Sequence, residues 1–130
     1  MKINGFNIIF SSFQGTQRRF FTLFVFLFSA GILSQSAISE QEKIERLIRS
    51  AEVSGYIFIR NDTEYTSREA ASYMKIKLSR AGNRIKTADQ FIKDLATRSS
   101  MTGRPYMVKL SNGKTLPLAD WLRRKLLEIN

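Results

Sequence analysis

The chain contains no cysteine and no histidine among its 130 residues, and it has only two prolines. Without a thiol or an imidazole it has no cysteine nucleophile, no Ser-His-Asp triad and no histidine acid–base catalyst. The usual ligands of zinc, haem and iron–sulfur clusters are missing as well. Composition leaves a carboxylate-only metal site open, but no motif indicates one. We therefore expect no enzyme, no cofactor and no metal.

Acidic residues are absent from the first 39 positions, whose only charged side chains are Lys2, Arg18 and Arg19. An apolar run over residues 20–33 follows the last two of these, and small and polar residues come after it. This order of basic, apolar and small-residue segments is typical of a secretory signal peptide. Cleavage after Ser36 or after Ser39 satisfies the small-x-small rule, and both positions stay open.

The alternative for this segment is an uncleaved anchor in the inner membrane. A membrane-spanning helix needs about 20 apolar residues, and the run over 20–33 is shorter, which favours cleavage. A lipoprotein is excluded because there is no cysteine to acylate. We expect residues 1–39 to be a signal peptide and residues 40–130 to be a single periplasmic domain. Membrane contact is then expected only through the signal segment before cleavage.

The remaining domain is basic. Of the 21 Lys and Arg residues three precede residue 40, while all 11 Asp and Glu residues follow it, so residues 40–130 carry a net charge of +7. No acid lies between Glu69 and Asp89, whereas five basic residues do: Lys75, Lys77, Arg80, Arg84 and Lys86. Such a stretch attracts anions.

Apolar spacing and capping signals predict four helices. The spacing i, i+3, i+4, i+7 predicts one helix over 40–54 and another from about Ala119 to the C-terminus. Two capping boxes, at 66–69 and at 87–90, predict the starts of two further helices. The first of these ends near Gly82, which supplies a stop signal.

Strands are predicted at 56–60 and at 106–110 from their β-branched, aromatic and alternating residues. Asn61-Asp62 is a turn after the first strand. Asn112-Gly113 fits a type I′ hairpin turn, after which a short return strand ends at Pro117. The predicted order is α-β-α-α-β-β-α, an α+β fold with about four helices on a small, mainly antiparallel sheet.

Several strings of the chain together resemble one protein family. They are Phe58-Ile59-Arg60-Asn61, Glu64-Tyr65, Ala81-Gly82-Asn83-Arg84-Ile85, and Ser99-Ser100 followed by Gly103 and Pro105-Tyr106. In this order they resemble the domain-of-unknown-function 5329 family of small, YfeK-like bacterial exported proteins. The resemblance implies a periplasmic protein but no function, because the family is uncharacterised. The family commonly has Gly where this chain has Asp62; Asp tolerates left-handed backbone better than most residues, so we expect the turn to be kept.

Ten residues are candidates for binding: Arg60, Asn61, Glu64, Tyr65, Lys77, Arg80, Arg84, Ser99, Ser100 and Arg104. The first four lie at a strand end and in the loop after it, where functional groups often lie; the alternative is a turn with a surface Arg–Glu pair. The next three share a helix face at i, i+3, i+7 if the helix extends that far; the alternative is a solvated face. The last three belong to a hydroxyl-rich loop whose amides can hold an anion; the alternative is a simple connector.

Two functions follow from these observations. The first is a non-catalytic interaction module whose basic surface recognises an anionic lipid head group, an acidic glycan or a partner protein. Nucleic acid is not expected, because an exported protein seldom meets it and no aromatic RNA-binding platform accompanies the charges. The alternative is a small hydrolase or glycan-processing accessory protein that uses carboxylates such as Glu64 and Glu69, which requires both in one cleft.

Overall fold

The computed structural model describes residues 36–130, of which residues 37–130 form one compact unit. Its α-helices are α2 (Glu40–Val53), α3 (Ser67–Ala81), α4 (Ala88–Gln90) and α5 (Leu118–Ile129). Its strands are β1 (Ile57–Arg60), β2 (Thr63–Tyr65), β3 (Met107–Lys109) and β4 (Thr115–Pro117). These helices and the antiparallel sheet confirm the predicted α+β fold. The expected signal peptide lies outside the described residues, apart from positions 36–39.

Side-chain caps fix where α2 and α3 begin. The Ser39 hydroxyl accepts a hydrogen bond from the Glu42 amide at 3.1 Å. At α3 the predicted capping box is complete: the Thr66 hydroxyl accepts from the Glu69 amide at 3.3 Å, and the Glu69 carboxylate accepts from the Thr66 amide at 2.8 Å. Gly82 follows α3 with φ +55° and ψ −134°, a backbone conformation that favours glycine. Both predicted helices are confirmed.

The third helix differs from its prediction. Regular α-helix covers only Ala88–Gln90, and the chain continues as a π-helix, η3 (Phe91–Leu95). The Thr87 hydroxyl accepts from the Gln90 amide at 3.1 Å, as predicted, but the Gln90 side chain accepts from the Lys86 amide at 2.7 Å and not from Thr87. The second capping box is therefore only half formed. A short 3₁₀ helix, η2 (Gly82–Arg84), connects α3 to this segment.

The sheet has the order β2-β1-β3-β4, with every neighbouring pair antiparallel. The strand β2 was not predicted, since residues 63–65 were expected to be loop. It forms because Asn61 and Asp62 both take left-handed backbone conformations, with φ of +51° and +64°. Two such residues make a type I′ turn, which returns the chain directly alongside β1. Asp62 thus keeps the turn, as expected.

The type I′ turn predicted at Asn112-Gly113 is wrong. In this hairpin only Gly113 has a positive φ, of +83°. The Leu110 carbonyl accepts from the Gly113 amide at 2.9 Å, and the Leu110 amide donates to the Lys114 carbonyl at 2.8 Å. This is a three-residue loop with a bulge, the other common way to close a hairpin. A single residue with positive φ suffices for it, and glycine provides that conformation.

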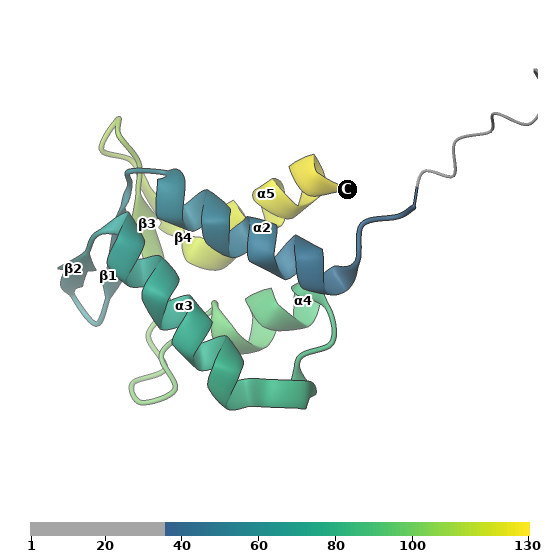
Figure 1. Cartoon of the computed structure of the whole chain (residues 1–130). Helices are drawn as coiled ribbons and strands as arrows, with labels where there is room; N and C mark the ends of the chain where they lie inside the picture. Colours follow the sequence, from purple (N-terminus) through teal and green to yellow (C-terminus); the bar gives the residue numbers. More distant parts are fainter. Residues whose placement is uncertain (1–35) are drawn as a thin grey trace, which may run out of the picture. The chain divides into compact units, whose positions relative to one another are not determined.

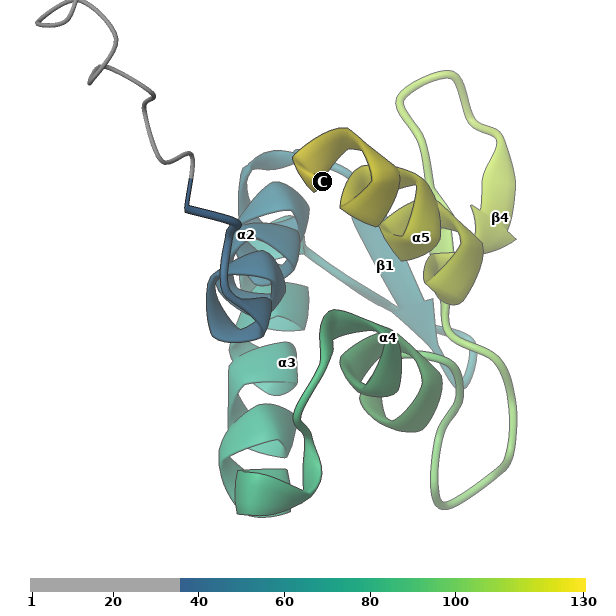
Figure 2. The ribbon, with the colours of Figure 1, turned by 90° about the vertical axis from the view of Figure 1, so that its right-hand side faces the viewer.

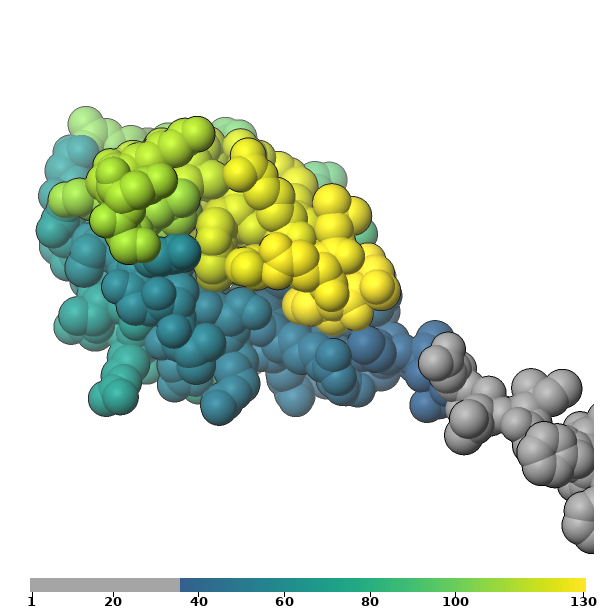
Figure 3. Space-filling model, turned by 90° about the horizontal axis from the view of Figure 1, so that it is seen from above, coloured from purple at the N-terminus to yellow at the C-terminus, as the bar shows by residue number. Residues whose placement is uncertain are grey.

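The core lies between one face of the sheet and the helices. The strand register aligns Phe58, Val108 and Leu116 on that face, and all three are buried. They meet apolar residues of the helices, among them Leu47 of α2 and Leu122 of α5. Figure 1 shows α2 packed along α3, and Figure 2 shows α4 and α5 in front of β1. Seen from above, α2, α5 and the β3–β4 hairpin lie side by side (Figure 3).

Within residues 36–130, no helix has both the length and the apolar composition that crossing a lipid bilayer requires.

Candidate functional site

A groove of about 320 Å³ opens between α3, the sheet and the segment that joins η3 to β3. Its lining is mostly apolar and aromatic, and no carboxylate contributes to it. This volume lies at the lower end of the range of small-molecule sites. Five of the ten predicted binding residues line the groove: Arg60, Tyr65, Lys77, Arg80 and Ser100.

Arg60 brings a positive charge to the helix-facing side of the sheet. Because strand residues alternate between faces, Arg60 lies on the same face as the buried Phe58. Its guanidinium carbon is 6.0 Å from the centre of the Tyr73 ring, and its Nε is buried without a hydrogen-bond partner. It forms no ion pair with any residue in the described part of the chain. An unpartnered buried donor costs free energy, so the Nε of Arg60 destabilises the fold, and the charge of the guanidinium is not neutralised by an acid of the described residues.

Aromatic and other apolar side chains form the wall beside Arg60. The Tyr65 and Tyr73 rings meet edge to face, with their centres 5.4 Å apart. On the rim, Tyr73 is 44% exposed, Ile76 is 45% exposed and Met101 is 83% exposed. An exposed group of large apolar residues next to cations is typical of a binding surface.

Lys77 is largely used inside the fold. Its Nζ donates to the Leu95 carbonyl and, at 3.1 Å, to the Tyr106 hydroxyl, and it lies 4.8 Å from the centre of the Tyr106 ring. These contacts tie α3 to the end of η3 and to the residue before β3. Lys77 therefore holds the groove walls together, and two of its three donors are occupied.

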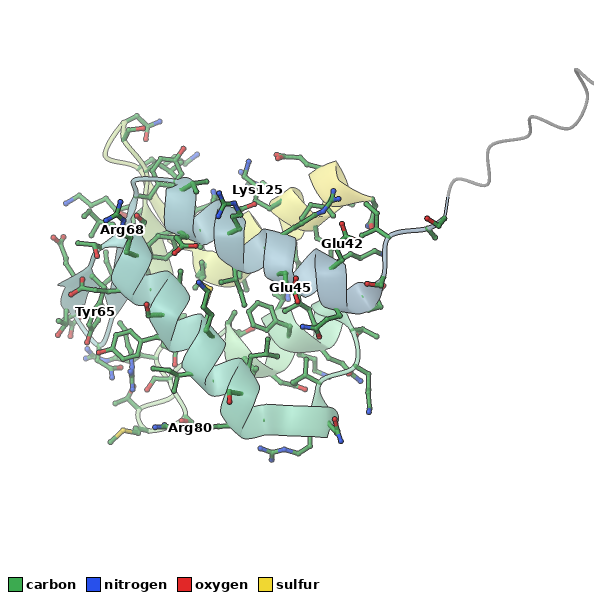
Figure 4. The ribbon with its side chains drawn as sticks, in the orientation of Figure 1. Glu42, Glu45, Tyr65, Arg68, Arg80 and Lys125 are labelled. Atoms are coloured by element: carbon green, nitrogen blue, oxygen red, sulfur yellow. The ribbon has the colours of Figure 1, made fainter. Side chains whose placement is uncertain are left out.

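The predicted basic face of α3 is divided. Arg80 is exposed, lines the groove and has no ion pair within residues 36–130. Arg84 does not line the groove, because α3 ends at Ala81 and the Arg84 Nε donates to the Ala81 carbonyl at 3.2 Å. The helix does not extend far enough for Arg84 to share the face. Figure 4 shows Tyr65 and Arg80 near opposite ends of α3.

The loop after η3 is fastened to the β1–β2 turn. The Thr102 hydroxyl donates to the Asn61 side-chain oxygen at 2.6 Å, and Arg104 forms an ion pair with Asp62. Two regions that the sequence suggested separately therefore contact each other across about 40 positions. Asn61 and Arg104 lie in this contact and not in the groove lining.

The same loop satisfies several of its own amides. The Ser99 amide donates to the Arg104 carbonyl at 2.9 Å, and the Gly103 amide donates to the Ser99 carbonyl at 2.8 Å. Ser99 is buried, and its hydroxyl has no partner, whereas Ser100 lines the groove. These internal bonds explain the shape of the loop and leave fewer amides for the predicted anion nest.

The two carboxylates of the hydrolase hypothesis lie outside the groove. Glu64 pairs with Lys109 at 3.4 Å, and so the surface Arg60–Glu64 pair is not formed. Glu69 caps α3, and the hydrogen bonds from the Thr66 amide and then the Thr66 hydroxyl hold the pKa of Glu69 below its ordinary value. This groove therefore does not supply the paired carboxylates that the hypothesis requires. Over residues 36–130, no three acidic side chains gather as metal ligands would.

A second stripe on α3, not predicted from the sequence, faces the groove. Tyr73, Ile76, Lys77 and Arg80 all line the groove, and their spacing is i, i+3, i+4, i+7. This is the same helical period that marks a core-facing stripe. The stripe mixes apolar and basic side chains, so it matches neither a core-facing stripe nor a purely basic face. A helix stripe in which apolar residues are followed by cationic ones at the helical period is the signal that would have found the groove.

Comparison with known proteins gives the chain a family. A model described as a family of unknown function, DUF5329, matches residues 38–130. The chain is also similar to the uncharacterized protein YfeK of Salmonella typhimurium, with 39% identity over 68 residues, which span 52% of this chain and 57% of that relative. No solved structure matches the chain. Since the family model covers the whole of the folded unit from Ile38 onwards, the chain belongs to the DUF5329 family of unknown function.

Proposed function

We propose that this chain is a non-catalytic binding module of the bacterial periplasm, and that the groove beside α3 receives an anionic group of its partner. The observation that carries the proposal is the pair Arg60 and Arg80. Both line a groove without carboxylates, and neither forms an ion pair within the described residues. A cation beside apolar walls attracts an anion more strongly than one surrounded by water.

The charge of the whole domain supports the same proposal. Residues 40–130 carry +7, and the 19 positions from Ala70 to Ala88, which include most of α3, contain no acid. Such a field attracts anions from a distance and raises their rate of association. Salt screens it over about 8 Å at physiological ionic strength, so binding is expected to weaken as salt is added.

The test uses dextran sulfate as a soluble anionic probe and uncharged dextran as its control. We expect the protein to bind only the sulfated polymer, and we expect Arg80→Glu to weaken that binding about tenfold. The matched control is Arg49→Glu on α2, since Arg49 is also without an ion pair but borders a different hollow. Equal loss in the two variants would assign binding to net charge alone and remove the groove from the proposal.

Export to the periplasm belongs to the same proposal, and the start of α2 bears on the cleavage position. Processing after Ser39 would remove the hydroxyl that caps Glu42 and the carbonyl that accepts from the Lys43 amide at 2.9 Å. It would also place a charged amine at the positive end of the helix dipole. Processing after Ser36 keeps both contacts. We expect N-terminal sequencing of the exported protein to begin at Ala37; a start at Glu40 would contradict this.

A further inference from the structure

We infer that the groove beside α3 binds a single-chain amphiphile, an alkyl chain that ends in a carboxylate or a phosphate, with its anionic end at Arg60. This inference rests on the proposed function and specifies its ligand. It follows from four features of the groove: its polar groups, its two inner strands, its exposed apolar rim and the place of its cations.

The polar side chains of the groove suit an anion and little else. Apart from tyrosine hydroxyls they are Arg60, Lys77, Arg80 and Ser100. No carboxylate and no side-chain amide lines it, so a cationic ligand would find no counter-ion, and the many hydroxyls of a neutral sugar would find only the tyrosine and serine hydroxyls as side-chain acceptors. The ligand must therefore combine a negative charge with a largely apolar body.

Most strand residues of the groove come from the two inner strands, β1 and β3, and the edge strand β2 supplies only Tyr65. β1 lies between β2 and β3, and β3 lies between β1 and β4. Their backbone amides and carbonyls are paired within the sheet, so an extended peptide cannot add to them as a further strand. A bound peptide would bring backbone groups that this lining leaves without partners. An alkyl chain makes no such demand.

The apolar rim is exposed in the free protein and suits a flexible chain. Tyr73, Ile76 and Met101 keep between 44% and 83% of their surface open, and Met74 lies behind them in the lining. Methionine side chains are unbranched and adapt their shape to a ligand. Each methylene group that a ligand buries on such a surface raises its affinity by up to about fourfold.

The two free cations differ in their surroundings, and this difference places the anionic end. Arg60 is half buried, has an unpartnered Nε and lies over the Tyr73 ring. Arg80 is seven residues beyond Tyr73, about 10 Å along the helix axis, and is exposed. The head group gains most at Arg60, because water competes least there. The chain then runs along α3 toward Arg80, whose aliphatic stem can cover it.

The test follows the methyl signals of Met74 and Met101 in ¹³C-methionine-labelled protein, assigned with single Met→Leu variants. Both residues line the groove: Met101 reports on its exposed rim, and Met74 reports on the place where it meets the core. Decanoate and decyl phosphate, each below its micelle concentration, are compared with decyltrimethylammonium. Shortening decanoate to octanoate removes two methylenes and should weaken binding by up to about fifteenfold.

The decisive variant is Arg60→Met, with Arg49→Met as its matched control. Because Arg60 has a buried donor without a partner, its replacement should leave the melting temperature unchanged or raise it. The same change should weaken the binding of both anionic amphiphiles at least tenfold, and Arg49→Met should not. Arg60 lies in the sheet, so the melting temperature of the Arg60→Met variant is measured to check that the variant is folded. A folded variant with weaker binding then tests the role of Arg60.

Three results would overturn the inference: equal shifts with decyltrimethylammonium, affinity unchanged in Arg60→Met, or no methyl shift with either anion. In the last case dextran sulfate separates the two proposals. If that polymer still binds in an Arg80-dependent way, the proposed function stands and only the amphiphile is rejected. If it does not bind either, both proposals fail.

Discussion

The two flanks of α3 each border a hollow, and the two hollows differ in how their charges are balanced. The hollow between α2 and α3 is lined by two carboxylates and two cations, and one pair of them, Glu52 and Lys75, is 3.6 Å apart. The groove on the other flank has three cations and no acid. Figure 4 shows Glu45 on the α2 side of α3, whereas Arg80 extends from the end of α3. The hollow on the α2 flank thus has as many acids as cations, whereas the groove flank has cations alone, of which Lys77 bonds inward.

The flanks also differ in their apolar side chains. On the α2 side Leu78 is half buried and packs against the core. On the groove side Tyr73 and Ile76 are exposed to more than 40%. Burial of apolar surface is the main source of folding stability. Folding therefore buries apolar surface on the α2 flank, whereas apolar side chains on the groove flank stay exposed to solvent. The comparison predicts that residues of the two flanks respond differently to the same substitution.

The largest expected difference is between Leu78→Ala and Ile76→Ala. Leu78→Ala removes packing against the core and should lower the free energy of unfolding by about 2 kcal/mol. Ile76→Ala, two positions earlier, removes exposed surface and should cost less than about 0.5 kcal/mol. Urea unfolding measures both. Equal losses would mean that the groove flank also contributes to the core, and the two flanks would not differ in burial as described.

The same substitution, lysine to methionine, can be made on each flank of α3: at Lys77 on the groove side and at Lys75 on the α2 side. Lys77→Met leaves the Leu95 carbonyl and the Tyr106 hydroxyl without their donor, which should cost about 1.5 kcal/mol. Lys75→Met breaks an exposed pair with Glu52 and should cost less than about 0.5 kcal/mol. Thermal unfolding of the two variants checks this. If Lys77→Met were as mild as Lys75→Met, Lys77 would be a free binding group after all.

Local signals in the sequence were sufficient for most of the fold. The capping box at Thr66 and Glu69 predicted the start of α3, because it depends only on residues three positions apart. The two hairpins were predicted less well: Asn112-Gly113 matches the usual type I′ pair, yet the type I′ turn forms at Asn61-Asp62. Asn-Asp and Asn-Gly both tolerate positive φ. Which of them takes positive φ at both residues depends on the register of the strands that the turn connects.

The candidate site was predictable only in part. Arg60, Tyr65, Lys77, Arg80 and Ser100 were named from sequence and do line one groove. Their meeting depends on contacts between distant segments, such as Thr102 with Asn61. No local pattern encodes such a contact. The opposite roles of Lys77 and Arg80 were likewise hidden, because a cation that bonds inward and one that faces solvent have the same place in a helical period.

Thr66→Ala acts on both flanks at once, because it weakens the start of α3. We expect a loss of about 1 kcal/mol in the free energy of unfolding. Thr87→Ala, where the box is half formed, should cost less, about 0.5 kcal/mol. Neither residue lines the groove, so amphiphile affinity at a temperature where both variants are folded should not change. A change in affinity with Thr66→Ala would show that the groove depends on the exact position of α3.

The smallest effect is expected from acid, and it should act on stability through two carboxylates outside the groove. Hydrogen bonds from Thr66 lower the pKa of Glu69, and the bond from the Ala88 amide, followed by that from Lys43, lowers the pKa of Glu40. A group whose pKa is lower in the folded state stabilises the fold above its unfolded pKa of about 4.5 and loses that contribution as the pH falls through the folded value.

Stability should therefore be level above about pH 5 with respect to these two groups and should decline below it. Glu69→Gln keeps an oxygen acceptor for the Thr66 amide but cannot titrate, so its unfolding free energy should fall less steeply between the unfolded and the folded pKa of Glu69 than that of the unchanged protein. Glu40→Gln should also make the unfolding free energy fall less steeply in acid, because it removes the second carboxylate that titrates. Urea unfolding at a series of acidic pH values measures the slopes. If neither variant alters the slope, the two caps do not contribute to acid unfolding, and both flanks of α3 depend on burial alone.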